Sequence, residues 1–126
     1  MHLRPTESEL EILQILWESG PATVRTVNDA LNAKREVGYT TTLKMMQIMK
    51  DKGLLTRERN GKTHIYQPAV AQETTRKALL DRFVENTFGG SAMQLVMQAL
   101  GNGKTSAADI DQIRAYLDEI ENETGK

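Results

Sequence analysis

The stretch Gly38–Gly53, GYTTTLKMMQIMKDKG, has the pattern of a helix with a marked start and a marked stop. Three consecutive threonines, Thr40 to Thr42, carry hydroxyl groups of the kind that cap the first turn of a helix. Gly53 stands where helices commonly end in a residue with a left-handed backbone, which glycine adopts without steric cost. The stretch therefore predicts a single helix.

The predicted helix has two chemically different sides. Leu43, Met46 and Met49 recur every third residue and form an apolar stripe toward a core. The opposite side of the first two turns carries polar or basic groups, namely Tyr39, Thr40, Thr41, Lys44 and Gln47. A helix N-terminus attracts phosphates, and such side chains can bond base edges in a DNA major groove. The pattern indicates a DNA recognition helix, although an ordinary amphipathic helix would look the same in isolation.

Two other helices are predicted before this stretch. Thr6 and Glu9 form a capping box at the start of a helix over residues 7–18, whose wide apolar face includes Trp17 as a core residue. Thr23 is a suitable N-cap for a second helix over residues 24–32, in which apolar residues again recur with helical spacing. The chain before Gly53 is therefore predicted to be entirely helical.

After Gly53 the apolar pattern changes to the period of two that is typical of strands. Residues 54–59 and 62–67 are predicted strands, and Asn60-Gly61 between them favours a tight hairpin turn because both residues tolerate positive φ. Leu55, Ile65 and Tyr66 are expected to anchor this hairpin on a core. The hairpin also carries the basic or titratable side chains Arg57, Arg59, Lys62 and His64.

The order of three helices and a basic hairpin is that of a winged helix-turn-helix. In such a domain the second helix crosses the DNA backbone, the third enters the groove and the hairpin forms the wing. We therefore predict a winged-helix DNA-binding domain over residues 1–68. The alternative is a winged-helix fold that serves as a protein-interaction module.

The second half of the chain is predicted to be a helical dimerisation domain over residues 69–126. Three helices are expected, over residues 70–88 and 92–100 and from Ser106, a cap with Asp109, to about Glu121. The middle helix is apolar around its whole axis, so a partner subunit is expected to cover it, although a monomeric helical extension is the alternative. The predicted interface consists of Leu80, Phe83, Val84, Phe88, Met93, Val96, Met97, Leu100, Ile113, Leu117 and Ile120.

The fold class is therefore mainly α with a small β-hairpin wing. The distribution of charge fits a first domain that binds DNA and a second that does not, because residues 1–67 carry a net charge of +2 and residues 68–126 carry −3. A two-fold dimer would match a palindromic operator, where two half-site contacts combine.

Other functional classes find little support in the composition. The chain has no cysteine, which excludes disulfides and thiolate metal sites and suits a reducing compartment. It has two histidines, His2 and His64, and it shows no catalytic triad, glycine-rich phosphate loop or zinc-protease motif. No apolar run approaches the length of a membrane span, and there is no signal core. We expect a cytoplasmic protein that is not an enzyme and needs no cofactor or metal.

Four stretches carry a family resemblance: Thr6–Trp17 (TESELEILQILW), Tyr39–Leu43 (YTTTL), Lys52–Leu55 (KGLL) and Asn60–Pro68 (NGKTHIYQP). With the later Gly89-Gly90 break and the two helices after it, the chain resembles the penicillinase repressor (BlaI/MecI) family of bacterial transcriptional regulators. The resemblance implies homodimeric repression at palindromic operators, often of β-lactam-resistance genes. In some members a membrane sensor-protease triggers cleavage in the short C-terminal helix.

The chain departs from the family at two points. Well-studied members are cleaved at an Asn-Phe bond, whereas alignment on Gly89-Gly90 places Gln98-Ala99 there, which puts cleavage at this bond in doubt. A copper-responsive branch carries Cys-x-Cys motifs near the C-terminus, and the absence of cysteine from this chain removes that mode of metal sensing.

The predicted DNA contacts fall into two groups. Thr40, Thr41 and Lys44 are expected to face the groove, with Tyr39 and Gln47 at the margins. Phosphate contacts that fix the register are expected from Thr23, Arg25, Arg57, Arg59, Lys62 and His64. For the wing residues, a solvated strand face is an equally good interpretation, because exposed hairpin edges favour basic side chains in any case.

Overall fold

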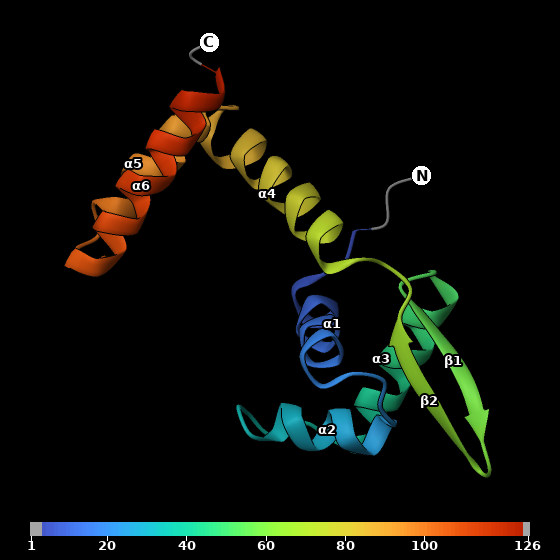
Figure 1. The fold of residues 1–126 in the computed structure, drawn as a ribbon. Helices are drawn as coiled ribbons and strands as arrows, with labels where there is room; N and C mark the ends of the chain where they lie inside the picture. The colour runs from blue at the N-terminus through green and yellow to red at the C-terminus, as the bar shows by residue number, and fades with distance from the viewer. Residues whose placement is uncertain (1–3, 125–126) are drawn as a thin grey trace. The chain divides into compact units, whose positions relative to one another are not determined.

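The computed structural model describes residues 4–124, which form six helices and one antiparallel hairpin (Figure 1). The elements in chain order are α1 (Glu7–Ser19), α2 (Val24–Asn32), α3 (Tyr39–Asp51), β1 (Leu55–Asn60), β2 (Thr63–Pro68), α4 (Gln72–Phe88), α5 (Ala92–Leu100) and α6 (Ala107–Thr124). The predicted fold class, mainly α with a hairpin wing, is confirmed. The chain divides into two compact units, one ending at Leu80 and the other beginning at Asp81.

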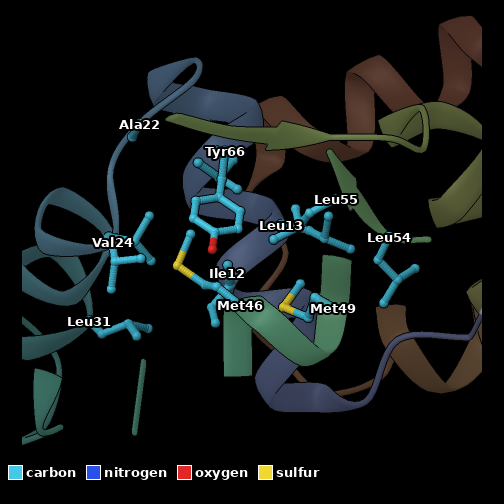
Figure 2. Close-up of a cluster of buried hydrophobic side chains, with 12 residues drawn as sticks. Ile12, Leu13, Ala22, Val24, Leu31, Met46, Met49, Leu54, Leu55 and Tyr66 are labelled. Atoms are coloured by element: carbon cyan, nitrogen blue, oxygen red, sulfur yellow. The ribbon is translucent and has the colours of Figure 1, made fainter. Parts of the chain in front are cut away.

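The first unit has a single hydrophobic core to which α1, α2, α3 and both strands contribute (Figure 2). Helix α1 provides Ile12, Leu13 and Leu16, and α3 provides Met46 and Met49 at the predicted spacing. The hairpin is anchored by Leu54, Leu55 and Tyr66, each at most 2% exposed, whereas Ile65 is only half-buried. The core therefore fixes α3 and the base of the hairpin to the same two helices.

Tyr66 also pairs with the segment between α1 and α2, a contact that the sequence did not predict. The Ala22 N–H donates to the Tyr66 carbonyl over 3.0 Å, and the Tyr66 N–H donates to the Ala22 carbonyl over 2.8 Å. This isolated bridge adds a third backbone segment to the edge of β2. It holds the start of α2 beside the hairpin.

The end of α3 is as predicted, but its start is not. Gly53 has φ of 86°, its N–H donates to the Lys50 carbonyl, and the next N–H, of Leu54, donates to the Met49 carbonyl. This is the Schellman arrangement. At the other end the N-cap is Gly38, with no side-chain hydrogen bond, so the prediction that Thr40 to Thr42 cap the helix is wrong. The helix begins at Tyr39, which places the threonines inside its first turn.

The hairpin turn lies one residue later than predicted. Asn60 pairs with Thr63, so the two turn residues are Gly61 and Lys62 rather than Asn60 and Gly61. Gly61 has φ of 66°, and no residue other than glycine has positive φ among residues 4–124. A glycine with positive φ at the first turn position is the pattern of a type II′ turn, which needs no left-handed asparagine.

Helix α4 begins at Gln72 rather than at residue 70. Val70 packs against the core, and its carbonyl accepts a hydrogen bond of 3.2 Å from the indole Nε1 of Trp17. That hydrogen bond ties the segment before α4 to α1, and the helix starts two residues later. Trp17 is half-buried against the core, in agreement with the role expected for it.

The second unit contains the end of α4, helix α5 and helix α6. Both predicted caps are present: Ser91 accepts from the N–H of Gln94, and Ser106 and Asp109 form a reciprocal pair. Neither α5 nor α6 has a buried residue within the described chain. No helix between residues 4 and 124 combines the length and the apolar character needed to cross a membrane.

Candidate nucleic-acid interface

A groove of about 460 Å³ lies between the start of α2, the outer side of α3 and the inner face of the hairpin. The residues that line it are Thr23, Val24, Arg25, Tyr39, Leu43, Gln47, Arg57, Lys62, Thr63, His64 and Tyr66. They come from three separate parts of the sequence. The core and the Ala22–Tyr66 bridge are what bring these parts together.

Arg25 and Tyr39 join α2 to α3 at one side of this groove. The Arg25 guanidinium carbon lies 5.2 Å from the centre of the Tyr39 ring, which is the geometry of a cation–π contact. Tyr39 is 43% exposed, so the stacked pair remains open to solvent. Thr23, just before α2, uses its hydroxyl to accept from the Thr26 N–H as the helix cap.

The hairpin presents its basic side chains on the same face as its core anchors. Arg57 is paired with Tyr66, and Arg59 with His64, so these four side chains share one face of the ribbon. Arg57 Nη1 donates to the Tyr66 hydroxyl over 3.3 Å, and Tyr66 is buried, so the core holds this guanidinium at the groove. Arg59 instead donates from Nε to the Gly61 carbonyl over 3.1 Å and does not line the groove.

The outer side of the first two turns of α3 is polar and open. Thr40, Thr41, Lys44 and Gln47 are exposed, and Gln47 also lines the groove. Thr42 is different from its two neighbours, because it is fully buried and faces α2. With no side-chain cap at Gly38, the N-terminal N–H groups of α3 and their dipole are available to an anion.

The groove is electrostatically one-sided. Within the described part of the chain, its lining includes Arg25, Arg57 and Lys62 and no acidic side chain. Such a surface, next to an open helix N-terminus with hydroxyl and amide groups, has the chemistry to hold phosphates and to bond base edges.

Seven of the eleven residues expected to contact DNA line this groove: Thr23, Arg25, Tyr39, Gln47, Arg57, Lys62 and His64. The other four, Thr40, Thr41, Lys44 and Arg59, lie outside it on exposed surface. Sequence reasoning missed Thr63, which follows the turn only because the turn is shifted by one residue. A glycine-first turn pattern at Gly61 would have indicated that shift.

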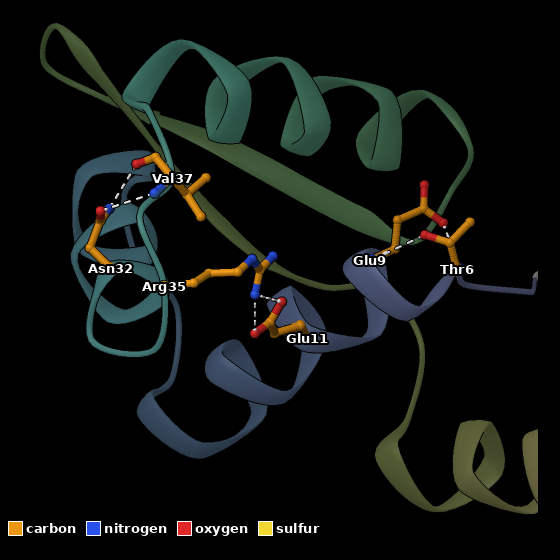
Figure 3. Close-up of polar contacts among 6 residues, drawn as sticks. All are labelled: Thr6, Glu9, Glu11, Asn32, Arg35 and Val37. Carbon is orange, nitrogen blue, oxygen red and sulfur yellow. Dashed lines mark hydrogen bonds and ion pairs between the residues drawn. The ribbon is translucent and has the colours of Figure 1, made fainter.

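An ion pair between the buried Glu9 and the exposed Lys52 supports α3 at its far end. Lys52 Nζ donates to the two carboxylate oxygens of Glu9 over 2.8 and 2.9 Å. The Glu9 carboxylate also accepts from the Thr6 N–H, and the Glu9 N–H donates to the Thr6 hydroxyl, which together form the predicted capping box (Figure 3). Burial alone would raise the pKa of Glu9, but the hydrogen bonds from Lys52 and Thr6 and the Lys52 charge outweigh it, so this pKa is lowered. The pair fixes α3 to α1.

The amino-acid sequence is similar to those of two proteins described as a transcriptional regulator and a repressor. The transcriptional regulator BlaI of Mycobacterium tuberculosis is 28% identical over 115 residues, which cover 90% of this chain and 82% of that protein. The penicillinase repressor of Bacillus licheniformis is 20% identical over 117 residues, covering 93% and 91% respectively.

Solved structures share the fold at low sequence identity. The DNA-binding domain of the repressor BlaI matches with a TM-score of 0.51 at 22% identity, over 57% of this chain and 90% of that domain. A MarR family protein from Bacillus stearothermophilus matches with a TM-score of 0.52 at 19% identity, over 96% of this chain and 76% of that one. The sequence model described as penicillinase repressor matches residues 5–119. The chain therefore belongs to the penicillinase repressor family of winged-helix transcriptional regulators.

Proposed function

We propose that this protein is a DNA-binding transcriptional repressor that acts as a homodimer on a palindromic operator, with β-lactam-resistance or related genes as its targets. The observation that carries the proposal is the groove itself. It combines three basic side chains, no acidic one among the described residues, and an uncapped helix N-terminus. DNA is the partner that needs both a positive surface and side chains able to read base edges.

In this proposal the first two turns of α3 enter the major groove. Thr40, Thr41 and Lys44 are exposed on the side of the helix away from the core, where they can meet base edges. Arg25 and Arg57 flank the helix from α2 and from the wing and would contact phosphates. The relative solved as "BlaI monomeric form in complex with the blaP half-operator" supports one subunit per half-site.

The second unit supports the homodimer. Its exposed apolar side chains include Phe83, Met93, Val96, Met97 and Leu117, which are 49–74% exposed. A set of large exposed apolar groups on adjacent helices is the usual mark of a surface that a second chain covers. The predicted interface residues Val84, Phe88, Leu100 and Ile113 are buried or half-buried within one chain, so they would back that surface.

From the family resemblance we also propose that a membrane sensor-protease acts upstream of this protein. Gln98 and Ala99, which stand at the position of the usual cleavage bond, are both exposed on α5. That bond is helical in the structure, so a protease would have to unwind α5 locally before cleaving it. This partner rests on the resemblance alone.

Salt dependence separates DNA binding from the alternative of a protein-interaction module. The three cations of the groove in each subunit give six phosphate contacts per dimer. With six such contacts, the affinity for DNA should fall by roughly 10³-fold between 50 and 200 mM salt. The measurement is fluorescence anisotropy on duplexes from upstream of the protein's own gene, followed by footprinting. A protected palindrome with this salt slope supports the proposal, and salt-insensitive or absent binding to every duplex contradicts it.

A pair of lysine substitutions tests the docking geometry. We expect Lys44→Ala to weaken operator binding by about tenfold, because Lys44 is the exposed cation of the first two turns of α3. The matched control is Lys77→Ala, which removes an exposed lysine from α4 and should leave affinity unchanged. Equal operator affinities of the two variants would refute the placement of α3 in the DNA major groove.

A further inference from the structure

Two asparagines one turn apart on α2 hold the segment that leads into α3. Asn32 Nδ2 donates to the Val37 carbonyl over 2.8 Å, and Asn32 Oδ1 accepts from the Val37 N–H over 3.1 Å (Figure 3). Asn28 Nδ2 donates to the same carbonyl over 3.0 Å. Both backbone groups of Val37 are thus bonded to α2. Asparagine is a poor helix former, so its presence twice in this short helix fits a specific bonding role.

Thr42 connects these asparagines to α3 itself. Its hydroxyl accepts from Asn28 Nδ2 over 2.8 Å and donates to the Gly38 carbonyl over 3.4 Å. The Thr42 side chain is fully buried, so its end of these part-buried bonds is shielded from water. We call Asn28, Asn32, Val37 and Thr42 the α2–α3 latch.

The latch fixes the direction in which α3 starts. Asn28 of α2 bonds the residue before the N-cap and a buried side chain of the first turn, and that side chain, Thr42, in turn bonds the carbonyl of the N-cap. None of its four residues lines the basic groove. The exposed Thr40 and Thr41, by contrast, lie directly between the latched positions, so their placement depends on it.

We infer that the α2–α3 latch is a positioning element for sequence discrimination, acting on DNA contacts that its own residues do not make. This rests on the proposed DNA-binding function. A base-edge hydrogen bond needs donor and acceptor at about 2.7–3.2 Å, so a small rotation of the first turn of α3 loses it. Attraction to phosphates falls off slowly with distance and tolerates the same shift. Loosening the latch therefore lowers specificity while leaving non-specific affinity in place.

Two substitutions at Thr42 separate hydrogen bonding from packing. Thr42→Val keeps the volume and removes the hydroxyl, whereas Thr42→Ser keeps the hydroxyl and removes a methyl group. The full-length protein is titrated with the duplex that wild type selects from a random-sequence library, and with a scrambled duplex of equal length and composition. Thr6→Ala, which removes the α1 cap far along the chain from the latch, controls for lost stability.

We expect Thr42→Val to lower the ratio of the two affinities by about tenfold with an unchanged salt slope, and Thr42→Ser and Thr6→Ala to keep the wild-type ratio. Asn28→Ala should repeat the Thr42→Val result, and it replaces that variant if the valine protein does not fold. If Thr42→Val, or Asn28→Ala in its place, keeps the wild-type ratio of the two affinities, the positioning role of the latch is refuted. It is also refuted if Thr42→Ser lowers that ratio as much as Thr42→Val does. Failure of wild type to select any sequence overturns the proposed function itself, and the latch with it.

Discussion

The carboxylate of Glu9 accepts three hydrogen bonds, two from Lys52 and one from Thr6. Glu9 is 5% exposed, and it is stabilised by Lys52, the C-cap of α3, and by Thr6, the N-cap of its own helix. Because its pKa in the folded chain is lower than its ordinary value of about 4.5, the ionised form stabilises the fold at every pH above that value. This contribution is lost as the pH falls through the lowered pKa.

We therefore expect Glu9→Gln to reduce the free energy of unfolding at pH 7 by about 1–2 kcal/mol, since Gln keeps the shape and loses the charge-assisted bonds. The difference between wild type and variant should shrink as the pH is lowered below about 4. Trp17 is the single tryptophan and lies in the first unit, so its fluorescence in urea titrations follows this unit. Glu7→Gln, at an exposed position of the same turn, is the control. A pH-independent difference would show that the ion pair does not contribute.

At the scale of the element, α3 depends on glycine at one end and not at the other. Gly53 has φ of 86°, so Gly53→Ala should cost about 1–2 kcal/mol of stability through left-handed strain. Gly38 has φ of −72° and open space around an added Cβ, so Gly38→Ser should be neutral or stabilising as a new cap. Urea titration followed by Trp17 fluorescence measures both. Equal losses at the two positions would contradict this account.

The wing offers a second comparison at this scale. Arg57 is held at the groove by Tyr66, whereas Arg59 is turned toward the Gly61 carbonyl. Arg57→Ala should weaken binding to operator and scrambled DNA alike and lower the salt slope by roughly one per subunit. Arg59→Ala should weaken operator binding less. Anisotropy titrations at several salt concentrations test this, and a larger loss for Arg59→Ala would mean that the wing docks differently.

How far the sequence predicts an element depends on whether its determinants are local. The stop of α3 at Gly53 was predictable because a left-handed residue is a local requirement. Its start was not: the N-cap is Gly38, and Thr42, one of the three threonines expected to cap the helix, is bonded to Asn28, fourteen residues earlier in the chain. The pairing of Ala22 with Tyr66 is likewise non-local, and no periodicity within either segment indicates it.

The candidate site shows the same limit. Residue type and helical or strand period indicated seven of the side chains that line the groove, because basic and hydroxyl groups stand out within each segment, but they did not indicate Thr63. They could not show that Arg57 is anchored on Tyr66 or that Arg25 stacks on Tyr39, since each contact joins different elements. Knowledge of register and packing is needed for those contacts.

At the scale of the whole molecule, the two units differ in how much they bury. The first has a closed core, while α5 and α6 of the second contain no buried residue in the described chain. Apolar burial supplies roughly 25 cal/mol per Å², so helices that bury little of their apolar surface gain little stability on their own. We expect the second unit to reach its full stability by association with a second copy.

Val96 on α5 is the position at which we would test that association. Val96→Asp should convert the dimer to a monomer, because a carboxylate buried without a partner at an interface costs about 3–5 kcal/mol. Sedimentation equilibrium gives the mass, and Trp17 fluorescence checks that the first unit stays folded. Asn122→Asp adds the same charge at an exposed polar position of α6 and should leave the mass unchanged. A dimer that survives the Val96 substitution would mean that α5 is not at the interface, and wild type sedimenting as a monomer would refute the homodimer.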